Sequence, residues 1–138
     1  MPPAKIVNAQ SACPCGHHSP LATCCLPFIR GVANPPTAEA LMRSRYTAHV
    51  LLDADYLWDT WNPEQRVRSN KEEIMGWASS CEWRGLQILK TEAGRHDDLD
   101  GLVTFIAIFR QNGKLHHHQE TSIFKKVLGR WLYVDHKS

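Results

Sequence analysis

The fold is decided by the stretch Leu102-Val103-Thr104-Phe105-Ile106-Ala107-Ile108-Phe109-Arg110, which runs directly into Gln111-Asn112-Gly113. The stretch is almost continuously apolar and rich in β-branched and aromatic residues, which favour strands. It is also short for a buried helix, so we interpret it as a central β-strand. Asn-Gly is the strongest short-range signal for a tight hairpin turn. The sequence therefore predicts an antiparallel sheet built around residues 102–110.

Strand signals continue on both sides of this stretch. The neighbouring segments carry apolar residues between polar ones and are separated by turns that contain glycine. We expect strands at residues 83–92, 115–126 and 130–134, with turns at 93–101 and 128–129.

Helix signals occur three times before the first of these strands. Thr37 is a suitable N-cap, and apolar residues follow it at helical spacing as far as Leu51. Asp53 is the expected cap of a second, short helix that Asn62-Pro63 ends, and residues 69–72 form a capping box for a third. Helices followed by a meander of antiparallel strands indicate an α+β fold.

A cluster of cysteines stands near the N-terminus. Cys13-Pro14-Cys15 is separated by eight residues from Cys24-Cys25. Four thiolates are a complete tetrahedral ligand set for zinc and leave no open position, so we expect structural rather than catalytic zinc. Pro14 restricts the backbone between the first two ligands, and Gly16 allows a sharp turn after them.

Other interpretations of the cysteines remain open at this stage. One is a disulfide, but we expect no signal peptide, which disfavours an oxidising compartment. Redox or iron–sulfur chemistry is another. His17 and His18 are candidate substitute ligands, although we expect them to be exposed loop residues. Cys81 lacks a surrounding cysteine motif, so we expect a partly buried packing residue.

These motifs resemble known families. Cys13-Pro14-Cys15-Gly16 with the later Cys24-Cys25 resembles the SEC-C motif, first noted at the C-terminus of the SecA translocation ATPase. The segments that follow are similar to the YchJ-like family of small bacterial proteins, through residues 40–46, 53–57 and 60–61. In that family a SEC-C motif precedes a domain similar to nuclear transport factor 2.

The resemblance implies an architecture rather than a reaction. It implies a SEC-C-like zinc motif over 13–30 and a nuclear transport factor 2-like domain over 37–138. In that domain, three helices pack on a curved antiparallel sheet to form a cone. Residues 1–12 contain two prolines and no apolar run, so we expect them to form a flexible lead-in. The motif loop here contains no lysine, unlike the usual SEC-C loop. That departure weakens any inference of binding to lipid headgroups or acidic partners.

Composition limits the classes of function. A formal net charge of +2 is too small for the basic signature of a nucleic-acid-binding domain. No apolar run is long enough for a membrane-spanning helix. Free thiols together with a metal cluster fit the cytoplasm, where we expect the protein to reside.

One strand carries a polar stripe that can face the inside of the cone. Alternation places His116, His118, Glu120 and Ser122 on one face. A histidine and a carboxylate two residues apart can exchange a proton or bind a polar ligand. The expected pocket residues are His118, Glu120, Ser122, Trp131 and Tyr133.

The same stripe has a simpler interpretation. A polar face of an antiparallel strand is usually the solvated face. Alternatively, Glu120 forms an ion pair with Arg43 or Arg45 and anchors a helix to the sheet. The tryptophans, including Trp131, more often fill a core than line a binding site.

Two functions follow from these patterns. In the first, which we favour, a zinc-stabilised nub binds a protein partner, and the cone serves as a scaffold or a homodimer interface. In the second, the cone pocket binds a small molecule or acts as a hydrolase- or isomerase-type enzyme. The absence of a nucleotide-binding loop and of a nucleophile elbow favours the first.

Overall fold

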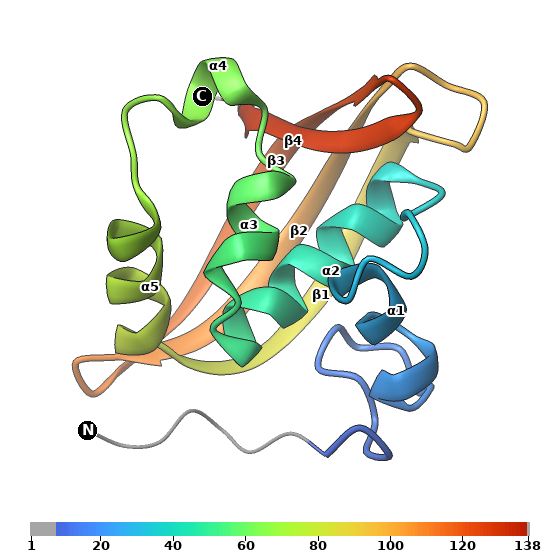
Figure 1. Ribbon diagram of the computed structural model, residues 1–138. Coiled ribbons are helices and arrows are strands. Elements are labelled where there is room, and N and C mark those ends of the chain that lie inside the picture. The colour runs from blue at the N-terminus through green and yellow to red at the C-terminus, as the bar shows by residue number, and fades with distance from the viewer. Residues whose placement is uncertain (1–7, 138) are drawn as a thin grey trace.

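The computed structural model describes residues 8–137, which form a four-stranded sheet, helices on one side of it, and a small N-terminal nub beside the helices (Figure 1). We use "nub" for residues 13–30 and "cone" for residues 37–136. The elements of the nub are η1 (Leu21–Thr23) and α1 (Leu26–Ile29). Those of the cone are α2 (Ala38–Leu51), α3 (Ala54–Asp59), α4 (Pro63–Arg66), α5 (Lys71–Ser80), β1 (Glu82–Ala93), β2 (Asp100–Gln111), β3 (Lys114–Val127) and β4 (Arg130–His136).

The sheet is an antiparallel meander in the order β1-β2-β3-β4. The predicted central strand is confirmed, since β2 pairs with a strand on each side. Asn112 and Gly113 connect β2 to β3 with φ angles of 52° and 76°, the left-handed backbone that an Asn-Gly hairpin requires. The α+β prediction is confirmed.

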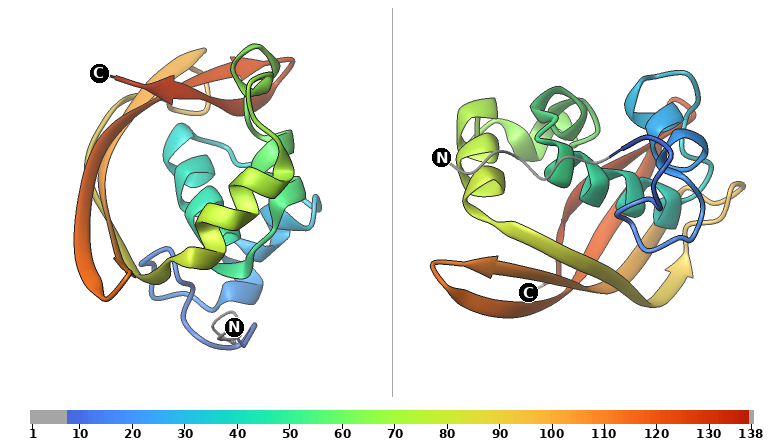
Figure 2. Two further views of the ribbon diagram at one scale, coloured as in Figure 1. Left: turned by 90° about the vertical axis from the view of Figure 1, so that its left-hand side faces the viewer. Right: turned by 90° about the horizontal axis from the view of Figure 1, so that it is seen from below.

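The sheet curves around the helices (Figure 2). Irregular pairing in β1, between Trp83 and Gly85 and between Ile88 and Lys90, provides places where a strand can bend. The alternate residues of β2 from Val103 to Phe109 are buried against the helices. The core therefore lies between the concave face of the sheet and the helices, as a cone requires.

An aromatic cluster packs α5 against the sheet. The ring of Trp83 lies 5.2 Å from Trp77, 5.3 Å from Phe109 and 5.7 Å from Tyr46, measured between ring centroids. These rings come from α5, β1, β2 and α2. Aromatic pairs at such distances add about 0.5–1.5 kcal/mol beyond the area they bury, so this cluster anchors α5.

The helix caps explain where the predicted helices begin. Thr37 caps α2 by accepting a hydrogen bond from the Ala40 amide at 3.0 Å. Asp53 caps α3 in the same manner. The capping box predicted at residues 69–72 is shifted by one residue: Asn70 is the cap of α5 and accepts from the amide of Glu73 at 2.8 Å. The short α4, which starts at Pro63, was not predicted.

The segment before the first cysteine is bound to the nub where the structure describes it. Residues 1–7 of the predicted lead-in lie outside the described residues. The Leu21 amide donates to the carbonyl of Ser11, and the Ala22 amide to that of Ala9. These two hydrogen bonds join residues 8–12 to the nub.

Candidate metal centre

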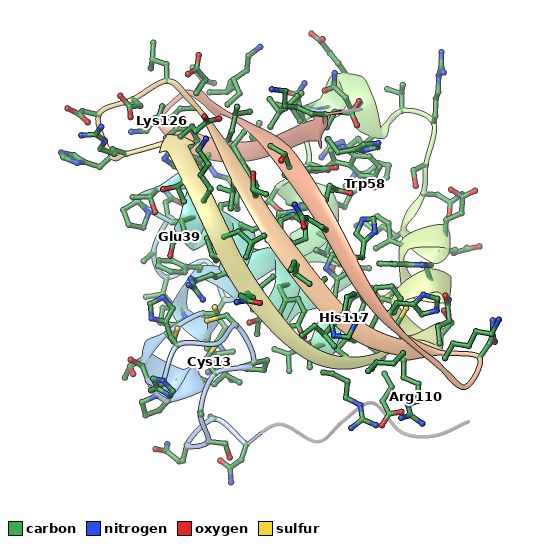
Figure 3. The ribbon with its side chains drawn as sticks, turned by 180° about the vertical axis from the view of Figure 1, so that it is seen from behind. Cys13, Glu39, Trp58, Arg110, His117 and Lys126 are labelled. Atoms are coloured by element: carbon green, nitrogen blue, oxygen red, sulfur yellow. The ribbon has the colours of Figure 1, made fainter. Side chains whose placement is uncertain are left out.

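The four nub cysteines come together in one cluster. Their sulfur atoms all lie within 4.8 Å of one another. The Sγ atoms of Cys15 and Cys24 are 3.6 Å apart, and those of Cys24 and Cys25 are 4.0 Å apart. Cys13, Cys15 and Cys25 are buried and Cys24 is half-buried. Figure 3 shows sulfur atoms gathered beside Cys13, at the edge of the molecule away from β4.

Local backbone geometry brings the two cysteine pairs together. Gly16 has a φ of 95°, a left-handed conformation that turns the chain directly after Cys15. The loop then returns, because the Cys13 amide donates to the carbonyl of Ser19 at 2.9 Å. Cys25 stands at the N-terminal end of α1. The ligand pairs therefore come from a tight loop and from the start of a short helix.

The donor set fits a metal ion. Four sulfurs around a tetrahedral centre at about 2.3 Å are about 3.8 Å from one another, close to the separations seen here. Burial and the nearby Cys15 sulfur raise the pKa of Cys24 to about 12. Hydrogen bonding from Cys15 lowers the pKa of Cys13. If all four cysteines, three of which are buried, are to be thiolates this close together, a cation must offset their mutual repulsion.

The nub is fixed to the cone through α2. The guanidinium Nη1 of Arg43 donates to the carbonyl oxygen of Cys15 at 2.6 Å, and its Nε binds Glu39 at 2.9 Å. The Cys13 sulfur lies 3.6 Å from the hydroxyl of Thr47. The cysteine cluster is thus packed against the longest helix of the cone.

The predicted polar stripe lies on the concave face of β3. His118 Nε2 is 3.1 Å from one carboxylate oxygen of Glu120, and the buried Ser122 hydroxyl donates to the other at 3.0 Å. Glu120 binds neither Arg43 nor Arg45, so the ion pair considered from sequence is wrong. Its partners come from its own strand instead.

The two predicted aromatic pocket residues, Trp131 and Tyr133, differ in how deeply they are buried. Trp131 is 1% exposed and donates its indole N–H to the Pro36 carbonyl at 3.2 Å, as a core residue does. Tyr133 is half-buried, and burial raises its pKa to about 12. Its ring lies 4.8 Å below the guanidinium carbon of Arg45.

Arg45 is a buried cation of α2. It is 8% exposed, and burial lowers its pKa to about 10, so it stays charged at neutral pH. Nη1 donates to the Leu57 carbonyl at 2.8 Å and to the Thr60 hydroxyl at 2.6 Å. Arg45 therefore ties α2 to α3. No pattern in the sequence distinguishes it from the neighbouring Arg43.

The structure also contains a groove that was not predicted. It has a volume of about 350 Å³ and lies between the nub with its linker and the α3–β4 side of the cone. Of the five expected pocket residues, only Trp131 lines it. The spacing of Asp55 and Asp59, one helical turn apart, was the available sequence signal for an acidic wall.

Comparison with known proteins places the chain in a family. Residues 37–136 match the model of the YchJ middle domain, described as nuclear transport factor 2-like. The chain is a member of the YchJ-like family. This YchJ-like chain is 40% identical over 123 residues to a UPF0225 protein of Geobacter sulfurreducens, covering 89% of the chain and 76% of that relative. It is 43% identical over 129 residues to one of Chromobacterium violaceum, covering 92% and 93%.

Two solved structures share the architecture of this YchJ-like chain. The solution structure of a SEC-C motif protein from Rhodopseudomonas palustris has a TM-score of 0.84 and 33% identity, covering 91% of this chain and 97% of that one. The crystal structure of a SEC-C motif protein from Psychrobacter arcticus has a TM-score of 0.80 and 27% identity, covering 92% and 82%. In the described part of the YchJ-like chain, each helix is too short or too polar to cross a membrane.

Proposed function

We propose that this protein is a zinc-stabilised interaction module of the cytoplasm, in which the nub presents a surface to a protein partner. The observation that carries this proposal is the closed cluster of Cys13, Cys15, Cys24 and Cys25. Four cysteine ligands leave no position for substrate, so the zinc is structural. Thiolate ligands select soft or borderline metals, and a tetrahedral four-sulfur arrangement is typical of zinc.

The nub needs this metal because its own core is small. Apart from the cysteines, Leu21 is the fully buried apolar residue of its cluster, with Leu26, Ile29 and Leu51 packed at the margin. Metal binding supplies folding free energy to such small units. The loop from Gly16 to Pro20 is exposed, so the folded nub displays it to a partner.

The cone has a face suited to self-association. The outward residues of β2 and β3 include no Asp, Glu, Lys or Arg over four consecutive pairs: Leu102 with Ile123, Thr104 with Thr121, Ile106 with Gln119, and Ile108 with His117. Figure 3 views the molecule from this side. Interface cores are depleted in charge, and we propose a homodimer through this face. Light scattering of wild type and Ile106→Asp tests it: a wild-type monomer at the highest soluble concentration would exclude it.

The metal proposal is tested by measuring the metal content of the protein together with its capture of partners. Tag-free protein should contain one zinc per chain by elemental analysis, and Cys24→Ser/Cys25→Ser should contain none. Cys81→Ser, which removes a cysteine outside the cluster, is the matched control and should keep its zinc.

Partner capture distinguishes the effect of losing the metal from the effect of changing the exposed loop. His17→Ala/His18→Ala keeps all four thiols and changes the exposed loop. We expect both this variant and the cysteine variant to lose partners that wild type and Cys81→Ser retain. Identical partner sets for all four proteins would exclude the nub as the contact.

A second candidate function rests on the hydrogen-bonded chain His118–Glu120–Ser122. In the neutral tautomer in which His118 donates from Nε2 to the carboxylate, Nδ1 carries no proton and can accept one. Such an arrangement suits proton abstraction from a small molecule. In a metabolite screen by thermal shift, Glu120→Gln should abolish ligand-induced stabilisation, whereas Gln119→Ala, on the opposite face, should not. A screen without any stabilising compound would count against this function.

A further inference from the structure

The groove between nub and cone has the size and position of a small-molecule site. Its volume of about 350 Å³ falls within the range of about 300–1,000 Å³ that is usual for such sites, which favour domain boundaries. One wall is formed by Phe28, Ile29 and Arg30 and by the linker as far as Pro35. The opposite wall is formed by α3 and by the first residues of β4.

The walls of this groove carry charged side chains of both signs that form no ion pair with another described residue. Arg30 and Arg130 line the groove, as does Asp59 at the end of α3. Among the ion pairs of the described residues, none includes any of these three. The other two aspartates of the groove are engaged elsewhere, one as the cap of α3 and the other with Lys71 at 2.7 Å. Two cations and one carboxylate thus remain available to a ligand.

We propose that the groove binds a small zwitterion, an amino acid or a dipeptide with free ends. The two guanidinium groups suit a carboxylate, which arginine binds through two parallel hydrogen bonds. Asp59 accepts the ammonium group of the same molecule. The half-buried side chains of Phe28 and Ile29 offer apolar contact to the ligand's side chain.

The nub wall of the groove is built directly on the cysteine cluster. The amides of Phe28 and Ile29 both donate to the carbonyl of Cys25, each at 3.1 Å. The Cys25 sulfur belongs to the proposed metal centre. Ligand binding should therefore weaken when the metal is removed, and ligand should in turn strengthen metal retention, because coupling between two sites is reciprocal. This inference adds a ligand site to the proposed function.

The test is a ¹H–¹⁵N NMR titration of the metal-loaded full chain with the dipeptide Gly-Leu. We expect saturable shifts of the amides of residues 29–31 and 59–60 and of the Trp131 indole. Arg130→Gln and Asp59→Asn should each raise the dissociation constant at least fivefold. Arg110→Gln, which removes an exposed cation outside the groove, should leave it unchanged. Free leucine in a parallel titration distinguishes an amino acid from a peptide, and tighter binding of either one supports the proposal.

Three results would overturn it. The first is the absence of saturable shifts at these positions with both probes. The second is an equal response to N-acetyl-Gly-Leu-amide, which lacks both terminal charges. The third is a response to inorganic phosphate only. Should the purified protein contain no zinc and still bind Gly-Leu in this groove, the metal proposal fails and the zwitterion site stands.

Discussion

Arg43 donates a hydrogen bond from Nη1 to the backbone carbonyl of Cys15 at 2.6 Å, across 28 residues of sequence. This contact joins α2 of the cone to the loop that carries two of the four cysteines. A charged donor to a neutral acceptor is among the stronger hydrogen bonds in proteins. The nub is therefore held by the cone as well as by its own thiolates.

Arg43→Met should lower the free energy of unfolding by about 1.5–3 kcal/mol, the range for a hydrogen bond with a charged partner. Methionine keeps much of the aliphatic stem and removes the donors. Urea unfolding monitored by tryptophan fluorescence measures the change. Arg84→Met is the control, because Arg84 forms an exposed pair with Glu82 that should contribute about 1 kcal/mol or less. Equal losses in the two variants would contradict a special role for Arg43.

Gly16→Ala should destabilise the protein and weaken metal retention. The backbone there has a φ of 95°, and a Cβ would lie 3.1 Å from the Leu86 carbonyl oxygen. An alanine at positive φ costs about 1–2 kcal/mol, and the close approach adds to that.

Gly113→Ala separates these two costs. Gly113 also has positive φ, but a Cβ at that position would meet nothing within 4 Å. The Gly113→Ala variant should therefore lose less stability than Gly16→Ala. It should also keep the wild-type affinity for zinc, as measured by competition with a chromogenic chelator. Equal losses for Gly16→Ala and Gly113→Ala would show that the approach to Leu86 is relieved at no cost.

The melting temperature should depend on free zinc concentration. A ligand at 100 times its dissociation constant stabilises the folded state by about 2.7 kcal/mol. We expect Cys24→Ser to abolish this dependence and Cys81→Ser to retain it. In NMR spectra of the chelator-treated protein, the amides of the nub should lose dispersion while those of the cone keep it. Uniform loss over the whole chain would mean that the cone also requires the metal.

Acid should destabilise the protein partly through His49. Burial, reinforced by the nearby Arg45 charge, lowers the pKa of His49 to about 4, whereas an unfolded histidine titrates near 6.5. The neutral ring donates from Nδ1 to the Arg45 carbonyl at 2.8 Å and packs against Trp77 and Trp83. Because the folded pKa is the lower one, this stability is complete above pH 6.5 and is lost as the pH falls towards 4.

His49→Gln isolates this contribution from the acid lability of the thiolates. Urea unfolding at each pH gives the fall in the free energy of unfolding between pH 7 and pH 4. This fall should be about 1–3 kcal/mol smaller for the variant than for wild type. Parallel pH profiles for the two proteins would show that His49 does not titrate in this range.

Much of the architecture was predictable because its signals are local. The run from Leu102 to Arg110 is flanked by an Asn-Gly turn, and hydrogen bonds between adjacent strands follow from that turn. Thr37 and Asp53 cap their helices through amides three residues away. The spacing of the four cysteines also indicated a single cluster, since a short loop can bring only nearby residues together. The shift of the third cap from Ser69 to Asn70 shows the precision limit of such local patterns.

The contacts made over long sequence separations were decided only by tertiary structure. Arg43 and Arg45 are two residues apart on one helix, yet one reaches the nub and the other lies buried below α3. The sequence did not determine which residues Glu120 binds, because its partners depend on how the strands and helices are placed. The groove exists because the end of α1 stands opposite α3 and β4.

The sequence by itself therefore determined most of the elements, their order and the set of clustered cysteines, because each depends on turns, caps and spacings within about fifteen residues. The tertiary structure decided which cations are buried, which carboxylates remain unpaired and where a ligand can enter. Those properties depend on the distance between surfaces that are far apart along the chain, and no local pattern encodes that distance.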